Sequence, residues 1–190
     1  MKSYTSIKPF LGFITLFIVL VVLSCKSSKT ENERSQDLSA LETKIRSKNF
    51  KIDITTVLPF NTNATTQVLN NLTRYTGNTA DRIFVNGYFI DFKNDSIIGY
   101  LPFYGEQRLS SNRYNSDLGI EFSGMPQEFS LDKHKRKDAY VMQFTINDNR
   151  DTTETYKVFI TFFPSNTADV NIVSSHRNSI NYRGQLENAN

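Results

Sequence analysis

The chain has 190 residues, of which 38% are hydrophobic and 22% are charged, so it is long enough for one ordinary domain but not for two full ones. This balance excludes a disordered, collagen-like or coiled-coil protein. The formal net charge is +3, and Lys2 and Lys8 supply two of the positive charges within the first 24 residues. Removal of that segment would leave a nearly neutral chain, which argues against general nucleic-acid binding because such binding depends on neutralising phosphates.

The first 24 residues have the pattern of a signal peptide. An uncharged apolar run of 14 residues, 10–23, follows the two lysines. That length suits a signal peptide and falls short of the ~20 residues that a membrane-spanning helix needs. An uncleaved membrane anchor is the alternative interpretation of this segment.

The signal-like segment ends in Val22-Leu23-Ser24-Cys25, which resembles a bacterial lipobox. The resemblance implies cleavage before Cys25, a diacylglyceryl group on its thiol, and acylation of the new amino group by a fatty acid such as palmitate. Cys25 is the only cysteine in the chain, so an intrachain disulfide is excluded. Several acyl chains hold a protein durably at a membrane. We therefore expect a lipid-anchored protein of the cell envelope, attached to the outer membrane and facing the periplasm.

A polar tether and one short helix are predicted next. Residues 25–36 are polar and have the composition of a flexible linker. Leu38, Leu41 and Ile45 then recur at the spacing of one helical face, which predicts an amphipathic helix over 37–48.

From residue 50 onward the apolar period changes to two, which predicts a β-domain over 50–187. The alternation indicates about eight to ten short strands, separated by turn-like clusters. Helical patterns do not separate successive strands, so a parallel βαβ fold is not expected. The predicted fold class is mainly β, either a single antiparallel sandwich or a partly closed barrel, and the pattern does not decide between them. A weaker strand pattern lies at 68–72.

The aromatic segment 100–105, with the sequence YLPFYG, is the most distinctive candidate for a binding site. One interpretation is the lip of a cleft for a ligand or partner, with Arg108 as an anion contact. The contact residues would then be Tyr100, Phe103, Tyr104, Arg108 and Tyr114. The other interpretation is structural, because aromatic rings more often fill cores than mark sites.

Three stretches of the chain carry a resemblance to a known family. They are YLPFYG, the GIEF at 119–122, and a closing pattern formed by Ser174, Arg177, Ile180, Tyr182 and Gly184. Together they resemble an uncharacterised bacterial lipoprotein family, domain of unknown function 4251, over residues 50–186. The resemblance implies one extracytoplasmic domain. It implies no activity and no catalytic residues, because the family has none assigned.

Two further features invite a functional interpretation. The basic run 132–138 lies between two predicted strands and is predicted to be a hairpin tip. It would either contact phosphate groups of lipid or lipopolysaccharide, or form a solvated turn. Ser96 and Thr152 each follow an aspartate and resemble the Asp-Ser/Thr-X acceptors of bacterial O-glycosylation systems.

Chemistry-bearing motifs are otherwise missing from the sequence. The two histidines, His134 and His176, do not form a zinc pattern, and no calcium loop, phosphate loop or dinucleotide motif is present. We therefore expect no metal, no cofactor and no enzymatic activity. The expected function is a binding domain for a small apolar ligand, a glycan or an envelope protein. An assembly accessory that acts through its sheet edges is the alternative, and a hydrolase with His176 as its base is the third hypothesis.

Overall fold

The computed structural model describes residues 30–59, 66, 79, 81–109 and 119–188. The chain divides into Met1–Glu33 and Arg34–Asn190, and the second of these units holds the β-structure. The signal-like segment, Cys25, the weak strand pattern at 68–72, and Tyr114 lie outside the described residues. Among the described residues, no helix combines the length and apolar character required to cross a membrane.

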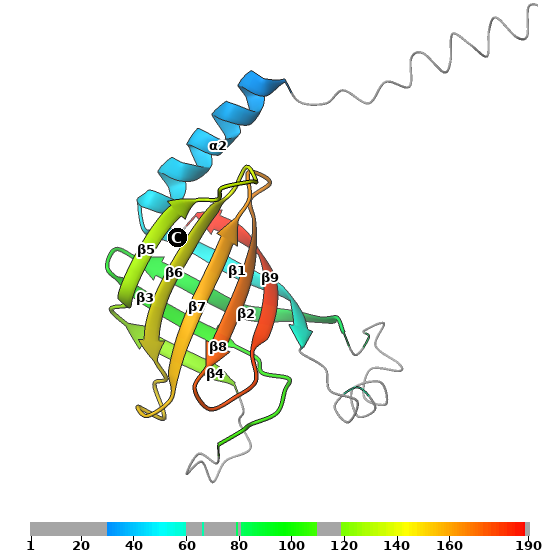
Figure 1. The fold of residues 1–190 in the computed structure, drawn as a ribbon, viewed down its shortest axis with the longest axis vertical. Helices are drawn as coiled ribbons and strands as arrows, with labels where there is room; N and C mark the ends of the chain where they lie inside the picture. The colour runs from blue at the N-terminus through cyan, green and yellow to red at the C-terminus, as the bar shows by residue number, and fades with distance from the viewer. Residues whose placement is uncertain (1–29, 60–65, 67–78, 80, 110–118, 189–190) are drawn as a thin grey trace, which may run out of the picture. The chain divides into compact units, whose positions relative to one another are not determined.

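The C-terminal part of the helix α2 (Glu31–Arg46) meets one end of the sheet (Figure 1). Its buried residues are those whose spacing predicted the helix: Leu38, Leu41 and Ile45. The helix begins six residues before the predicted start and takes in part of the predicted tether. The backbone N–H of Thr30 donates to Glu33 Oε2 at 3.0 Å, which is one of the two hydrogen bonds of a capping box and stabilises this earlier start.

The described part of the chain forms a single nine-stranded sheet. The strands are β1 (Asn49–Pro59), β2 (Ile83–Lys93), β3 (Ser96–Leu101), β4 (Ile120–Gly124), β5 (Gln127–Lys133), β6 (Tyr140–Asn147), β7 (Thr155–Phe162), β8 (Thr167–Ser174) and β9 (Ile180–Asn188). Their order is β4-β3-β2-β1-β9-β8-β7-β6-β5, and every adjacent pair is antiparallel. The mainly-β prediction is confirmed, with a strand number inside the predicted range.

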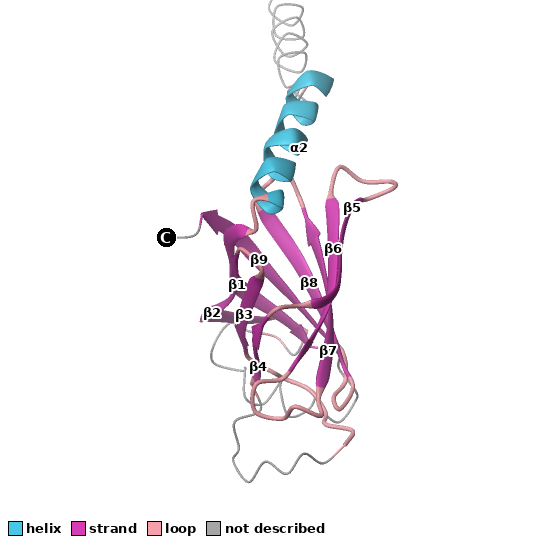
Figure 2. Ribbon diagram, turned by 90° about the vertical axis from the view of Figure 1, so that its left-hand side faces the viewer, coloured by secondary structure: helices cyan, strands magenta, loops and turns pink. Residues whose placement is uncertain are grey.

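The sheet curls into a half-barrel around one core (Figure 1 and Figure 2). Every second side chain of strands such as β6 and β7 is buried, as the two-residue period predicted. Fully buried aromatic rings fill the interior: Phe50, Phe92, Phe122, Phe144, Phe162, Tyr156 and Tyr182. The curl brings β4 against β6, where the ring centroids of Phe122 and Phe144 lie 6.4 Å apart. The domain is therefore a partly closed barrel built from one continuous sheet.

The join between β1 and β9 depends on a glycine. Gly184 pairs with Ile54, beside the irregularity between Ile54 and Thr56. A Cβ at position 184 would lie 2.5 Å from the backbone oxygen of Asp53, so only glycine fits between the two strands. The two halves of the sheet meet at this pair.

Candidate functional site

The predicted aromatic site is divided between the core and the surface. Phe103 is buried, and its ring centroid lies 5.1 Å from the guanidinium carbon of Arg177. The guanidinium of Arg108 donates to the backbone oxygens of Ser174, at 3.2 Å, and Arg177, at 2.7 Å. Tyr104 is half-buried against the core. These contacts place Phe103 in the packing at one end of the barrel. Arg108 is an exposed residue whose guanidinium is fixed on the end of β8 and the turn that follows it.

Tyr100 instead lies on the outside of the sheet, where 41% of its surface is exposed. Its ring stacks on that of Tyr88, with centroids 5.3 Å apart. The register pairs Tyr100 with Phe89 and Ile98 with Asp91, so the outward side chains of β2 and β3 are neighbours. We call Phe89, Ile98 and Tyr100 the outer aromatic face. Tyr88 stacks on Tyr100 at its edge but pairs with buried Ile54 and packs against the core.

A buried ion pair holds the end of the barrel opposite α2. Arg177 and Glu154 have almost no exposed surface, and Arg177 Nε lies 2.9 Å from Glu154 Oε1. Arg177 Nη2 also donates to Glu154 Oε2 at 3.0 Å, so both carboxylate oxygens contact the guanidinium. The Ser174 hydroxyl donates to Glu154 Oε1 at 2.6 Å, and Arg177 Nη1 donates to the backbone oxygen of Gly119 at 3.2 Å. The β6–β7 turn, the β8–β9 turn and the start of β4 are thus joined by one cluster.

Two tyrosines extend this cluster into the core. The hydroxyl of Tyr156 donates to Asp148 Oδ2 at 2.5 Å, and that of Tyr182 donates to the backbone oxygen of Pro102 at 2.8 Å. Burial raises the pKa of Tyr182 well above its usual value of 10.0. Burial and then the hydrogen bond to Asp148 raise the pKa of Tyr156 in the same direction. Both phenols therefore stay neutral, and both serve as hydrogen-bond donors.

The hydrolase hypothesis placed a base at His176, close to two serines. Its Nδ1 lies 2.7 Å from the hydroxyl of Ser175, the adjacent residue in the chain. The Ser175 hydroxyl also accepts the backbone N–H of Thr155 at 3.0 Å. Ser174 is engaged with Glu154 in the buried cluster. These contacts tie the β8–β9 turn to the start of β7.

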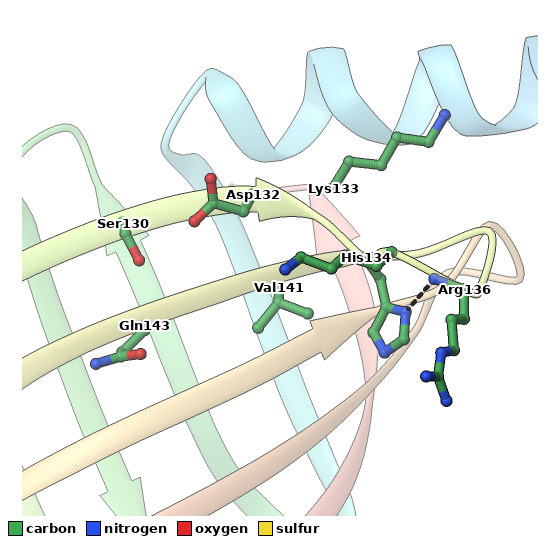
Figure 3. Close-up of a pocket in the computed structure, with 8 residues that line it drawn as sticks. Ser130, Asp132, Lys133, His134, Arg136, Val141 and Gln143 are labelled. Carbon is green, nitrogen blue, oxygen red and sulfur yellow. Dashed lines mark hydrogen bonds between the residues drawn. The ribbon is translucent and has the colours of Figure 1, made fainter.

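The second surface feature is the β5–β6 hairpin tip, which the sequence predicted at 132–138. An open hollow of about 520 Å³ lies beside this tip, on the outer side of β5 and β6 (Figure 3). It is lined by Ser130, Asp132, Lys133, His134, Lys135, Arg136, Val141 and Gln143. The prediction of a hairpin tip is confirmed. The hollow was not predicted, because its floor comes from outward residues of two paired strands.

His134 organises this tip. Its Nδ1 accepts the backbone N–H groups of Arg136, at 3.1 Å, and Lys137, at 3.2 Å. The backbone N–H of His134 donates to the Ala139 oxygen at 2.8 Å and closes the loop. Since Nδ1 is an acceptor, the ring proton of the neutral imidazole belongs on Nε2.

The two O-glycosylation candidates lie in separate places. Ser96 is half-buried at the start of β3, and Thr152 is exposed in the β6–β7 turn. Within the described ranges, no group of three or more histidine, cysteine, aspartate or glutamate side chains lies close enough to hold a metal ion.

A family model described as "Domain of unknown function (DUF4251)" matches residues 32–186, which is most of the chain. The chain belongs to this family. The resemblance found in the sequence is therefore confirmed, and the match extends it from residue 50 back into α2. No curated protein and no solved structure matches the chain.

The residues that carried the DUF4251 resemblance lie in the end opposite α2 or at the sheet join. Ser174 and Arg177 belong to the buried cluster, Tyr182 bonds to the YLPFYG segment, and Gly184 fits against β1. Sequence reasoning missed the partner of Arg177, because Glu154 lies in a polar turn that looks solvent-exposed. A buried arginine needs a buried acid, and that requirement was the available signal.

Proposed function

We propose that this DUF4251 chain is a lipid-anchored, non-enzymatic binding domain that docks an envelope protein through its outer aromatic face. The anchor would be Cys25, at the end of its lipobox-like segment, and the location would be the outer membrane facing the periplasm. The observation that carries the proposal is the exposed ring of Tyr100 on Tyr88. Exposed apolar patches rimmed by polar residues are typical of protein-binding surfaces.

The position of the outer aromatic face favours a macromolecular partner. Small ligands need a concave site that covers most of their surface, whereas this face lies on the outside of a curled sheet. The interior of the barrel is filled by the side chains of its own core. Tyrosine is also the residue type that often contributes most to protein–protein affinity.

Charged groups frame the outer aromatic face. Lys51 Nζ lies 4.9 Å from the centroid of the Phe89 ring, and Asp91 pairs with Lys93 at 3.1 Å. Glu121, which pairs with Tyr100 across β3 and β4, contacts Arg150. An apolar centre with a polar rim is the usual anatomy of a protein interface.

The test is a binding titration with a partner found by site-specific crosslinking. A photo-reactive side chain at Ile98 is used in intact cells to capture the partner, which is then purified. We expect Tyr100→Ala to weaken binding about 30-fold, the effect of one interface hot spot. Val173→Ala is the matched control, because Val173 is as exposed as Tyr100 but lies on β8.

Two results would count against this function. Unchanged affinity in Tyr100→Ala would remove the outer aromatic face as the docking site. Loss of binding on substitution of outward residues of β5, with Tyr100→Ala unaffected, would instead support an assembly role at the sheet edge.

A further inference from the structure

The β5–β6 tip keeps a net positive charge: Lys133, Lys135, Arg136 and Lys137 outnumber the flanking Asp132 and Asp138. Lys135, Arg136 and Lys137 are consecutive and exposed. Within the described residues, the ion pairs of the domain involve other cations: Arg46, Lys48, Lys93, Arg150, Arg177 and Arg183. The tip therefore keeps three hydrated cations available to an external anion.

The tip is also shaped before any anion arrives. His134 holds the backbone N–H groups of Arg136 and Lys137, so the loop that presents the cations has a defined conformation. Gln143 and Ser130 add neutral hydrogen-bonding groups to the hollow beside them (Figure 3). A site formed in advance costs less ordering entropy on binding.

The location of the tip indicates which anion it meets. Tyr140 is the first residue of β6 and directly follows the tip. Its hydroxyl donates to Glu42 Oε2 on α2 at 2.5 Å. The tip and α2 therefore lie at the same end of the barrel, as Figure 1 and Figure 3 show. Through α2 the N-terminal chain enters the domain. Glu31, where α2 begins, is the sixth residue after Cys25, so an extended tether there spans at most about 20 Å, because an extended residue covers about 3.5 Å.

We propose that the β5–β6 tip binds the phosphate groups of anionic lipid headgroups in the membrane that holds the anchor. Lys135, Arg136 and Lys137 neutralise headgroup phosphates, and the hollow receives one headgroup. The contact sets the orientation of the domain and leaves the outer aromatic face free. This inference rests on the lipid anchor of the proposed function and not on its docking face.

The test uses the lipid-modified full chain purified from membranes. Acylated Cys25 leaves no free native thiol, so Asp138→Cys takes a single fluorescent dye at the tip. The chain is added to vesicles of phosphatidylcholine, alone or mixed with phosphatidylglycerol, that contain a headgroup-labelled quenching lipid. We expect strong quenching with phosphatidylglycerol, weakening as salt rises because exposed charges are screened. A dye at Thr152→Cys, in the β6–β7 turn, should stay unquenched.

Two sets of substitutions distinguish binding by the tip from a general effect of positive charge on vesicle binding. Replacing Lys135, Arg136 and Lys137 with glutamine should abolish the extra quenching and lower affinity for anionic vesicles about fivefold per cation removed. Replacing Arg82, Lys157 and Arg183, which are exposed and lie away from the tip and the outer aromatic face, with glutamine removes the same charge and should preserve the quenching. Equal quenching in neutral vesicles, or quenching that survives the tip substitutions, would overturn the proposal.

Two further measurements test whether the ligand is free phosphate and whether Cys25 is the membrane anchor. A dye response to inorganic phosphate without vesicles, with no quenching in anionic vesicles, would identify a soluble phosphate as the ligand and overturn the lipid proposal. Flotation with neutral vesicles that persists in Cys25→Ser would show that the anchor is wrong. Binding through the outer aromatic face is measured separately with Tyr100→Ala, so failure of one proposal does not imply failure of the other.

Discussion

The two ends of strands β6 to β9 use positive charge in opposite ways. At one end, Arg177 is buried and paired with Glu154. At the other end, Lys135 to Lys137 are exposed and unpaired within the described chain. Burial makes a cation expensive unless an acid is fixed beside it, so Arg177 becomes part of the scaffold. An exposed cation keeps its hydration and stays available to a ligand. Charge alone does not identify a binding site; burial and pairing do.

The two ends also differ in how they are closed. The Arg177 end is closed by polar contacts among turns, whereas the other end meets the apolar face of α2. At the polar end, each buried polar group needs its own hydrogen-bond partner. Removing one member of the cluster therefore leaves another without a partner. The stabilisation that the apolar face of α2 provides depends on the buried apolar area and its shape. It does not require each group to have a specific partner.

The largest expected effect comes from breaking the polar end. Arg177→Ala leaves Glu154 buried without its cation, and we expect the free energy of unfolding to fall by about 3–5 kcal/mol. Urea denaturation followed by tyrosine fluorescence measures this loss. The double variant Arg177→Met with Glu154→Leu removes both charges and should recover a substantial part of it. A double variant less stable than Arg177→Ala would contradict this account.

The fall in the free energy of unfolding at alkaline pH tests one tyrosine from each end of the barrel. Tyr182 has its pKa raised well above 10.0 by burial, while burial and the bond to Glu42 raise that of Tyr140 less. The unfolded chain ionises near pH 10 and the folded chain does not, so stability is present below pH 10 and is lost as pH rises through the folded value.

Each such tyrosine should cost about 1.4 kcal/mol per pH unit over that interval. Just above pH 10, Tyr182→Phe and Tyr140→Phe should flatten the decline equally, and Tyr182→Phe should go on flattening it to a higher pH. Chemical denaturation at a series of pH values gives both curves. Curves that stay identical over the whole alkaline range would mean that the ends do not differ in this respect.

The smallest effect is expected at the tip. His134→Ala removes an acceptor from an exposed loop and should change the free energy of unfolding by no more than about 0.5 kcal/mol. The same change should accelerate hydrogen exchange of the Arg136 and Lys137 amides, which lose their Nδ1 acceptor. His134→Asn keeps an acceptor and should restore most of the protection. Unchanged exchange in His134→Ala would show that the imidazole does not order the tip.

Local periodicity predicted the elements of the fold well. The alternation in β6 and β7 and the helical spacing of Leu38, Leu41 and Ile45 follow from which side chains face the core. The sequence does not predict whether the sheet curls into a barrel, because the strands of sandwiches and barrels alternate in the same way. Closure depends on contacts between distant strands, such as Phe122 with Phe144, that no local pattern contains.

The candidate site was less predictable than the fold. The YLPFYG segment is distinctive, yet its residues divide between a buried ring, Phe103, and an exposed one, Tyr100. Their roles depend on where β3 ends and on which turn packs beneath it. The hollow beside the tip requires the pairing of β5 with β6, which sequence spacing cannot supply. The lipid anchor stays a prediction.

The pairing of β1 with β9 makes the sheet dependent on its last strand. Residue Phe50 lies opposite Asn188, so this ladder joins the two ends of the described domain. Within β1 to β4 and within β5 to β9, each strand pairs with the next one along the chain, and contacts between segments close in sequence form faster than distant ones. Joining the two groups must wait until β9 has been synthesised. A chain truncated before β9 would therefore carry two additional open sheet edges, at β1 and β8, and those edges would invite aggregation or proteolysis.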